Sequence, residues 1–132
     1  MEEKYCFAVP QKAFIVNKGK FLILKRSESA PVYPNYWDLP GGKLEHGEEP
    51  KEGLEREVRE ETTLKVSVGK IIFSYLEINI QHAYVVIFEC NLINGEINLS
   101  KEHSKYKWVD AVEAKKLLLE PFLEKFLLQK KI

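Results

Sequence analysis

Seven glutamates lie within residues 48–61, a segment that also holds one lysine and two arginines. The segment has a net charge of −4, whereas the formal net charge of the whole chain is zero. A solvent-exposed helix face with ion pairs explains part of this pattern. Glu52 stands four residues before Arg56, for example, which is the favourable order for a helical ion pair.

Glu57 does not fit such a face. Its helical neighbours at three and four residues include Glu60 and Glu61 but no cation, and each like-charge pair destabilises a helix by about 0.2–0.5 kcal/mol. Three carboxylates with this spacing project from one side of a helix and offer oxygen ligands to a hard cation such as Mg²⁺. Gly53, one turn earlier, leaves room on that side. The spacing alone leaves a metal site and a solvated acidic face as equal alternatives.

The elements that must position these carboxylates follow from local sequence patterns. Apolar and aromatic runs typical of strands occupy residues 5–16, 21–26, 65–92 and 105–109. Helix formers occupy residues 51–62, 110–119 and a last segment that begins at 121. A proline precedes the first of these helices, where its fixed φ is favourable. This order predicts a layered α/β or α+β domain rather than an alternating βαβ repeat.

Length and composition are those of a single globular domain spanning residues 1–132, with 45% hydrophobic and 30% charged residues. Zero net charge argues against a general binder of nucleic-acid polymers. No apolar run approaches the ~20 residues of a membrane span, and the acidic start does not resemble a signal peptide. We therefore expect a cytoplasmic protein, in which Cys6 and Cys90 are buried thiols rather than a disulfide framework.

The acidic helix also carries a recognisable motif. Gly42, Glu48 and the run from Arg56 to Leu64 follow the pattern G-x5-E-x7-R-E-U-x-E-E-x-G-U, where U is a bulky aliphatic residue. This pattern resembles the Nudix box, and Leu39-Pro40-Gly41 resembles its usual lead-in. The resemblance implies the fold of that family, an α/β/α sandwich in which a mixed β-sheet is flanked by helices.

Thr63 is the one departure, because it stands where the box has its second glycine. That glycine resembles a helix C-terminal residue with left-handed geometry. A β-branched residue in this conformation costs roughly 1–2 kcal/mol. The departure concerns the end of the helix and removes no candidate ligand.

The resemblance implies metal-dependent hydrolysis of a nucleoside diphosphate linked to another group X. Divalent ions, Mg²⁺ or Mn²⁺, neutralise the phosphates and polarise the attacking water in such a reaction. By position, the implied metal ligands are the Gly41 carbonyl, Glu57, Glu60, Glu61 and Glu102. Gly42 and Glu48 are implied as supporting residues, and Arg56 as a residue that orients a neighbouring glutamate.

The implied catalytic residues are Glu57, Glu60, Glu102 and Arg56. The general base stays open between Glu57 and Glu102. Glu102 stands six residues before Trp108, a place that resembles that of a loop glutamate in MutT-like members. An ordinary exposed loop glutamate is the alternative.

Other candidates lie outside the box. Arg26 is a candidate phosphate contact, and Trp37 is a candidate for stacking on a base, with core packing as the alternative. His82 and His103 are isolated in the sequence, and we expect neither to bind metal.

The substrate class is inferred by elimination. The chain lacks the proline after the box that marks the ADP-ribose type, and it lacks the coenzyme A lead-in. The leading hypothesis is therefore a MutT-like nucleoside triphosphate pyrophosphohydrolase, acting on a small nucleotide as a monomer or homodimer. The alternatives are a nucleotide-binding or sensor module that does not hydrolyse, a hydrolase of dinucleoside polyphosphates or nucleotide sugars, and a prenyl diphosphate isomerase.

Overall fold

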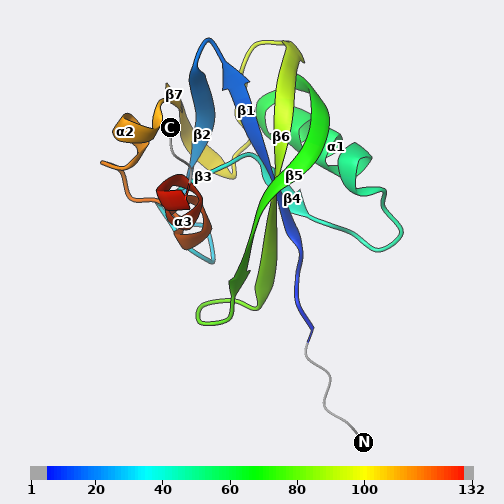
Figure 1. Cartoon of the computed structure of the whole chain (residues 1–132), viewed down its shortest axis with the longest axis vertical. Helices are drawn as coiled ribbons and strands as arrows, with labels where there is room; N and C mark the ends of the chain where they lie inside the picture. The colour runs from blue at the N-terminus through cyan, green and yellow to red at the C-terminus, as the bar shows by residue number, and fades with distance from the viewer. Residues whose placement is uncertain (1–5, 130–132) are drawn as a thin grey trace, which may run out of the picture.

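The computed structural model describes residues 6–129 (Figure 1). Its strands are β1 (Pro10–Asn17), β2 (Lys20–Arg26), β3 (Trp37–Asp38), β4 (Gly41–Lys43), β5 (Lys65–Glu77), β6 (Ala83–Asn94) and β7 (His103–Val109). Its helices are α1 (Pro50–Thr62), α2 (Ala111–Ala114) and α3 (Pro121–Gln129). No helix within residues 6–129 is long and apolar enough to cross a membrane.

All seven strands belong to one mixed sheet. Its main order is β3-β2-β1-β6-β5, while β4 pairs with β1 and β7 pairs with β2. β1 and β6 run parallel, whereas the other pairs are antiparallel, including the hairpin of β1 and β2. β1 therefore lies at the centre of the sheet, in contact with β4 and α1.

The two faces of the sheet carry separate hydrophobic cores, because successive side chains of a strand point to opposite faces. On β1, Ala13 and Ile15 pack in the core under Leu54 and Val58 of α1. Phe14, between them in sequence, packs in the other core with residues of α3. In Figure 1, α1 and α3 accordingly lie on opposite sides of the sheet. The predicted α/β/α sandwich is confirmed.

Two predicted elements have different bounds. The first predicted strand starts at residue 5, which lies outside the described residues, and β1 starts only at Pro10. The predicted helix 110–119 is wrong beyond α2. Asp110 caps α2 in a capping box with Glu113. Beyond α2, the backbone of Trp37 forms hydrogen bonds with the backbone on both sides of Leu119. This backbone pairing with β3 replaces the expected last turns of the helix.

The two cysteines differ in environment. Cys90 is buried on β6, as expected, and burial raises the pKa of its thiol to about 12. Cys6 is exposed, so the expectation that it is a core thiol is wrong. Cys6 precedes β1 and lies outside both hydrophobic cores.

Candidate active site

Helix α1 presents the carboxylates of the box because its opposite side is anchored. Leu54 and Val58 are fully buried against the sheet. The helix then ends at Thr63, whose φ of 64° is left-handed, the geometry expected for the glycine of the box. The Thr63 N–H donates to the Arg59 carbonyl at 2.8 Å, and its hydroxyl donates to the Glu96 carbonyl. The hydrogen bond from the Thr63 hydroxyl offsets part of the strain of its left-handed backbone conformation.

Glu102 reaches the helix because the β6–β7 loop, residues 95–102, is fastened to it. The backbone N–H of Ser100 donates to the carbonyl of Glu61 at 3.0 Å, and the N–H of Ser27 donates to the carbonyl of Glu102, also at 3.0 Å. Burial is the main cause of the raised pKa of Glu57 and of Glu61, and the Glu102 carboxylate lies close enough to both to add to it. The structure thus brings together carboxylates that are far apart in the sequence.

Glu61 is the buried carboxylate of the site, with 5% of its surface exposed. Its Oε1 accepts the backbone N–H of Gly41 at 2.8 Å, on β4. Burial raises the pKa of Glu61 to about 8, although Lys12 and the Gly41 hydrogen bond act in the opposite direction. A buried carboxylate with so few polar partners is one that a bound cation would stabilise.

His103 lies directly beside Glu61, at a distance of 3.9 Å between Nδ1 and Oε2. One ligand atom from each of Glu61, Glu102 and His103 falls within 4.8 Å of the others, a grouping suited to a metal ion. Burial lowers the pKa of His103 to about 4. The expectation that His103 is isolated is therefore wrong, because the start of β7 places it against α1.

The Glu57 carboxylate packs on Gly42, since a Cβ added there would lie 2.5 Å from Glu57 Cδ. This contact explains why a glycine precedes the helix at that position. Burial raises the pKa of Glu57 above its ordinary value. The expectation that Glu57 has no local cation is wrong, because Nη2 of Arg56 reaches Oε1 of Glu57 at 3.2 Å.

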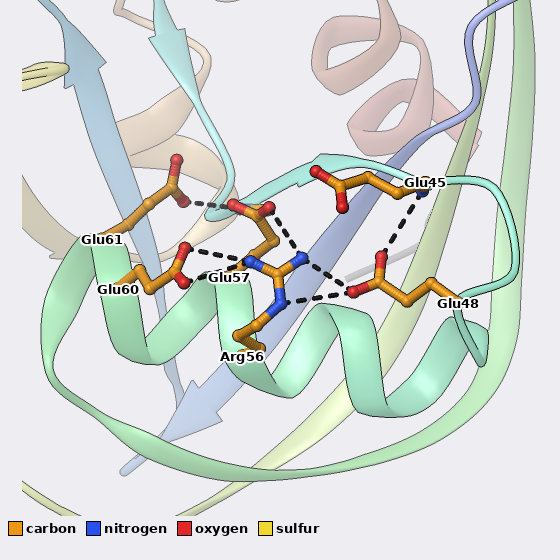
Figure 2. A network of polar contacts seen from close by, with 7 residues as sticks. Glu45, Glu48, Arg56, Glu57, Glu60 and Glu61 are labelled. Atoms are coloured by element: carbon orange, nitrogen blue, oxygen red, sulfur yellow. Dashed lines mark hydrogen bonds and ion pairs between the residues drawn. The ribbon is translucent and has the colours of Figure 1, made fainter.

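Arg56 joins three carboxylates, and Figure 2 shows its guanidinium between Glu48 on one side and Glu57 and Glu60 on the other. It donates to Glu48 at 2.7 Å through Nη2 and to both carboxylate oxygens of Glu60 at 3.0 and 3.1 Å. These bonds lower the pKa of Glu48. The open space predicted at Gly53 is taken by the Glu48 side chain.

A pocket of about 210 Å³ opens beside these groups. Its ionisable lining residues include Lys12, Arg26, Asp38, Glu61, Glu102 and Glu120. Gly41 and Gly42 also line it, whereas Glu57 and Glu60 do not. Arg26 reaches it from the end of β2 and donates to Asp38 at 3.3 Å. This is a position from which a cation can meet an anionic ligand.

Three buried residues of the pocket were missed from the sequence: Lys12, Asp38 and Glu120. Lys12 Nζ donates to Asp38 Oδ2 at 2.9 Å. Burial, together with the nearby Asp38, raises the pKa of Glu120 to about 9. The available signal was a lysine inside an apolar strand, since buried charges require partners.

Trp37 is not placed for stacking on a ligand. Its side chain is 5% exposed and packs in the core under α3, and it does not line the pocket. Lys107 Nζ lies 5.6 Å from the centre of its ring. The structure therefore contradicts the stacking role and supports core packing, the alternative.

Comparisons with known proteins identify the family of this chain. The family model for the NUDIX domain matches residues 11–129. Nucleoside triphosphatase NudI of Escherichia fergusonii is 32% identical over 107 residues, which cover 72% of this chain and 76% of that protein. NudI of an Escherichia coli strain is 33% identical over 107 residues, which again cover 72% of this chain and 76% of that protein.

Solved structures give the same result. The MutT protein of Methanosarcina mazei is 30% identical, with a TM-score of 0.87 over 97% of this chain and 95% of that one. A MutT NUDIX hydrolase of Burkholderia pseudomallei shares the fold at 23% identity, with a TM-score of 0.75 over 97% of this chain and all of that one. The chain therefore belongs to the Nudix family and is a Nudix hydrolase.

Proposed function

We propose that this Nudix hydrolase is a metal-dependent nucleoside triphosphate pyrophosphohydrolase, which releases a nucleoside monophosphate and pyrophosphate. The observation that carries the proposal is that Glu61 and Glu102 come together in the lining of the pocket, with Glu57 near enough to Glu102 to feel its charge. The triphosphatase name of the NudI relatives supports the substrate class. We propose one domain, residues 1–132, as the active unit, acting on cytoplasmic nucleotides.

The donor groups present fit a divalent ion. Glu61 is a buried carboxylate whose negative charge is not fully compensated by a neighbouring cation. Glu57 and Glu102 add oxygens of the kind that Mg²⁺ prefers. We propose Glu57, Glu60, Glu61, Glu102 and the Gly41 carbonyl as the residues that would hold the ion. A divalent ion bound there would neutralise phosphate charge and lower the pKa of a water molecule.

The residues of the chain would then have distinct roles in the reaction. Arg56 fixes Glu48, Glu57 and Glu60 in one arrangement. Glu102, exposed on its loop, would accept a proton from the attacking water, and Glu57 is the alternative base. Arg26, which lines the pocket, would contact phosphate.

The nucleoside would occupy the pocket. The buried pair of Lys12 and Asp38, together with Glu120, offers it hydrogen-bonding groups. A small number of placed polar groups of this kind is typical of ligand pockets.

A release assay tests the proposal. Nucleoside triphosphates, dinucleoside polyphosphates and nucleotide sugars are each incubated with Mg²⁺ or Mn²⁺, with and without excess EDTA. We expect pyrophosphate from at least one triphosphate and none in EDTA. Full activity in EDTA would contradict the metal dependence, and turnover confined to the other two classes would replace the proposed substrate.

A further inference from the structure

The imidazole of His103 is buried without a hydrogen bond. The residue is 6% exposed, and neither Nδ1 nor Nε2 has a hydrogen-bond partner among the residues that the structure describes. A buried polar group left in this state costs about 1–3 kcal/mol. Most such groups in folded proteins are satisfied, so the position requires an explanation.

The surroundings of the ring indicate what would satisfy it. His103 Nδ1 faces Glu61 Oε2 at 3.9 Å, which is too long for a hydrogen bond. One carboxylate oxygen from Glu61, one from Glu102 and a nitrogen of His103 all lie within 4.8 Å of one another. Two ligand atoms that each bind one metal ion at about 2.0–2.2 Å lie up to ~4.4 Å apart. A small decrease in the distances between the three ligand atoms would therefore let them bind the same ion.

We propose that His103 is a direct nitrogen ligand of a divalent ion that it shares with Glu61 and Glu102. This inference rests on the proposed metal-dependent function and adds a metal preference to it. Mg²⁺ takes oxygen ligands, whereas imidazole suits transition ions such as Co²⁺ and Zn²⁺. The position beside His103 therefore favours a transition-metal ion over Mg²⁺.

Histidine ligation is measured directly by pulsed electron paramagnetic resonance of the protein loaded with Mn²⁺ alone. We expect the unmodified protein to show coupling to a bound nitrogen, which changes when histidine is labelled with ¹⁵N. His103→Asn should lose this coupling. His82→Asn, at an exposed histidine, should keep it.

Calorimetry provides a second readout. We expect His103→Asn to weaken Co²⁺ binding by at least about tenfold and to change Mg²⁺ binding by less than about threefold, since Mg²⁺ relies on the carboxylates. Equal losses for both ions would contradict the preference for a transition metal.

The spectra also separate this inference from the function on which it rests. Bound Mn²⁺ without histidine coupling in the unmodified protein would overturn the inference, while metal-dependent hydrolysis would stand. Coupling that survives in His103→Asn would overturn it too, since another histidine would then be the ligand. A protein that binds no Mn²⁺ and hydrolyses no nucleotide would refute both proposals.

Discussion

The backbone N–H of Ser100 donates to the backbone carbonyl of Glu61 at 3.0 Å. This bond fastens the β6–β7 loop to the last turn of α1, two segments that are far apart in the sequence. It places Glu102 on the loop beside Glu61 on the helix. The loop carboxylate is therefore positioned by the backbone, and its side chain is free to act on a ligand.

Glu102→Gln tests this arrangement. Because the residue is exposed and held through its backbone, we expect turnover to fall by about tenfold or more, with an unchanged melting temperature. Glu96→Gln, an exposed change in the same loop, is the matched control and should keep full activity. If both variants retained the parent's rate, Glu102 would be an ordinary loop glutamate.

Arg56→Lys tests the positioning of the carboxylates. Lysine keeps the charge but cannot reproduce the fork of bonds to Glu48, Glu57 and Glu60. We expect kcat/KM to fall by about 10- to 100-fold, the usual loss when an orienting partner is removed. Arg59→Lys, exposed on the same helix, should be neutral. Similar kinetics for the two variants would show that Arg56 does not orient the site.

The strain at Thr63 is measured by comparing two variants. Thr63→Ala and Thr63→Gly both lose the hydroxyl bond to the Glu96 carbonyl, but only alanine keeps a Cβ at a φ of 64°. Relief of roughly 1–2 kcal/mol outweighs the extra chain entropy of glycine, about 0.5–1 kcal/mol. We expect Thr63→Gly to be more stable than Thr63→Ala in urea unfolding. The opposite order would mean that the left-handed position is not strained.

Glu120 makes stability depend on pH. Burial raises its pKa from an ordinary value of 4.5 to about 9, so between these values the folded chain holds a proton that the unfolded chain has released. The free energy of unfolding then falls as pH rises, by up to ~1.4 kcal/mol per pH unit from this group. We expect Glu120→Gln to have a smaller slope than the parent between about pH 6 and 8, where the remaining slope comes from Glu61, whose pKa burial raises to about 8. Glu124→Gln, exposed on α3, should keep the full slope. Identical slopes in all three proteins would show that Glu120 is ionised in the fold.

The helix of the site could be predicted from the sequence because its signals are local. The spacing of Glu57, Glu60 and Glu61 lies within two helical turns, and Leu54 and Val58 mark the side that docks on the sheet. The box pattern marks residue 63 as the end of the helix, but the substitution of threonine for glycine left its conformation open. The structure shows that Thr63 keeps the left-handed geometry.

The rest of the site depends on contacts between distant segments. Lys12 and Asp38 are 26 residues apart and meet only because β4 and β3 fold back beside β1 and β2. His103 looks isolated until β7 pairs with β2 and brings it to α1. The helix expected to continue to residue 119 ends early because the backbone there forms hydrogen bonds with Trp37. No local sequence pattern indicates these bonds.

The central claim is that the box carboxylates form a metal-dependent hydrolytic site, and Glu57→Gln tests it most directly. Glu52→Gln, exposed five residues earlier on the same helix, is the control for the loss of a negative charge. The measurement is the rate of pyrophosphate release from the best triphosphate with saturating Mg²⁺. We predict a fall of at least ~10²-fold for Glu57→Gln, because it removes a ligand or the base, and no change for Glu52→Gln. Equal rates for Glu57→Gln and the parent would contradict the assignment and leave Glu57 as a surface charge.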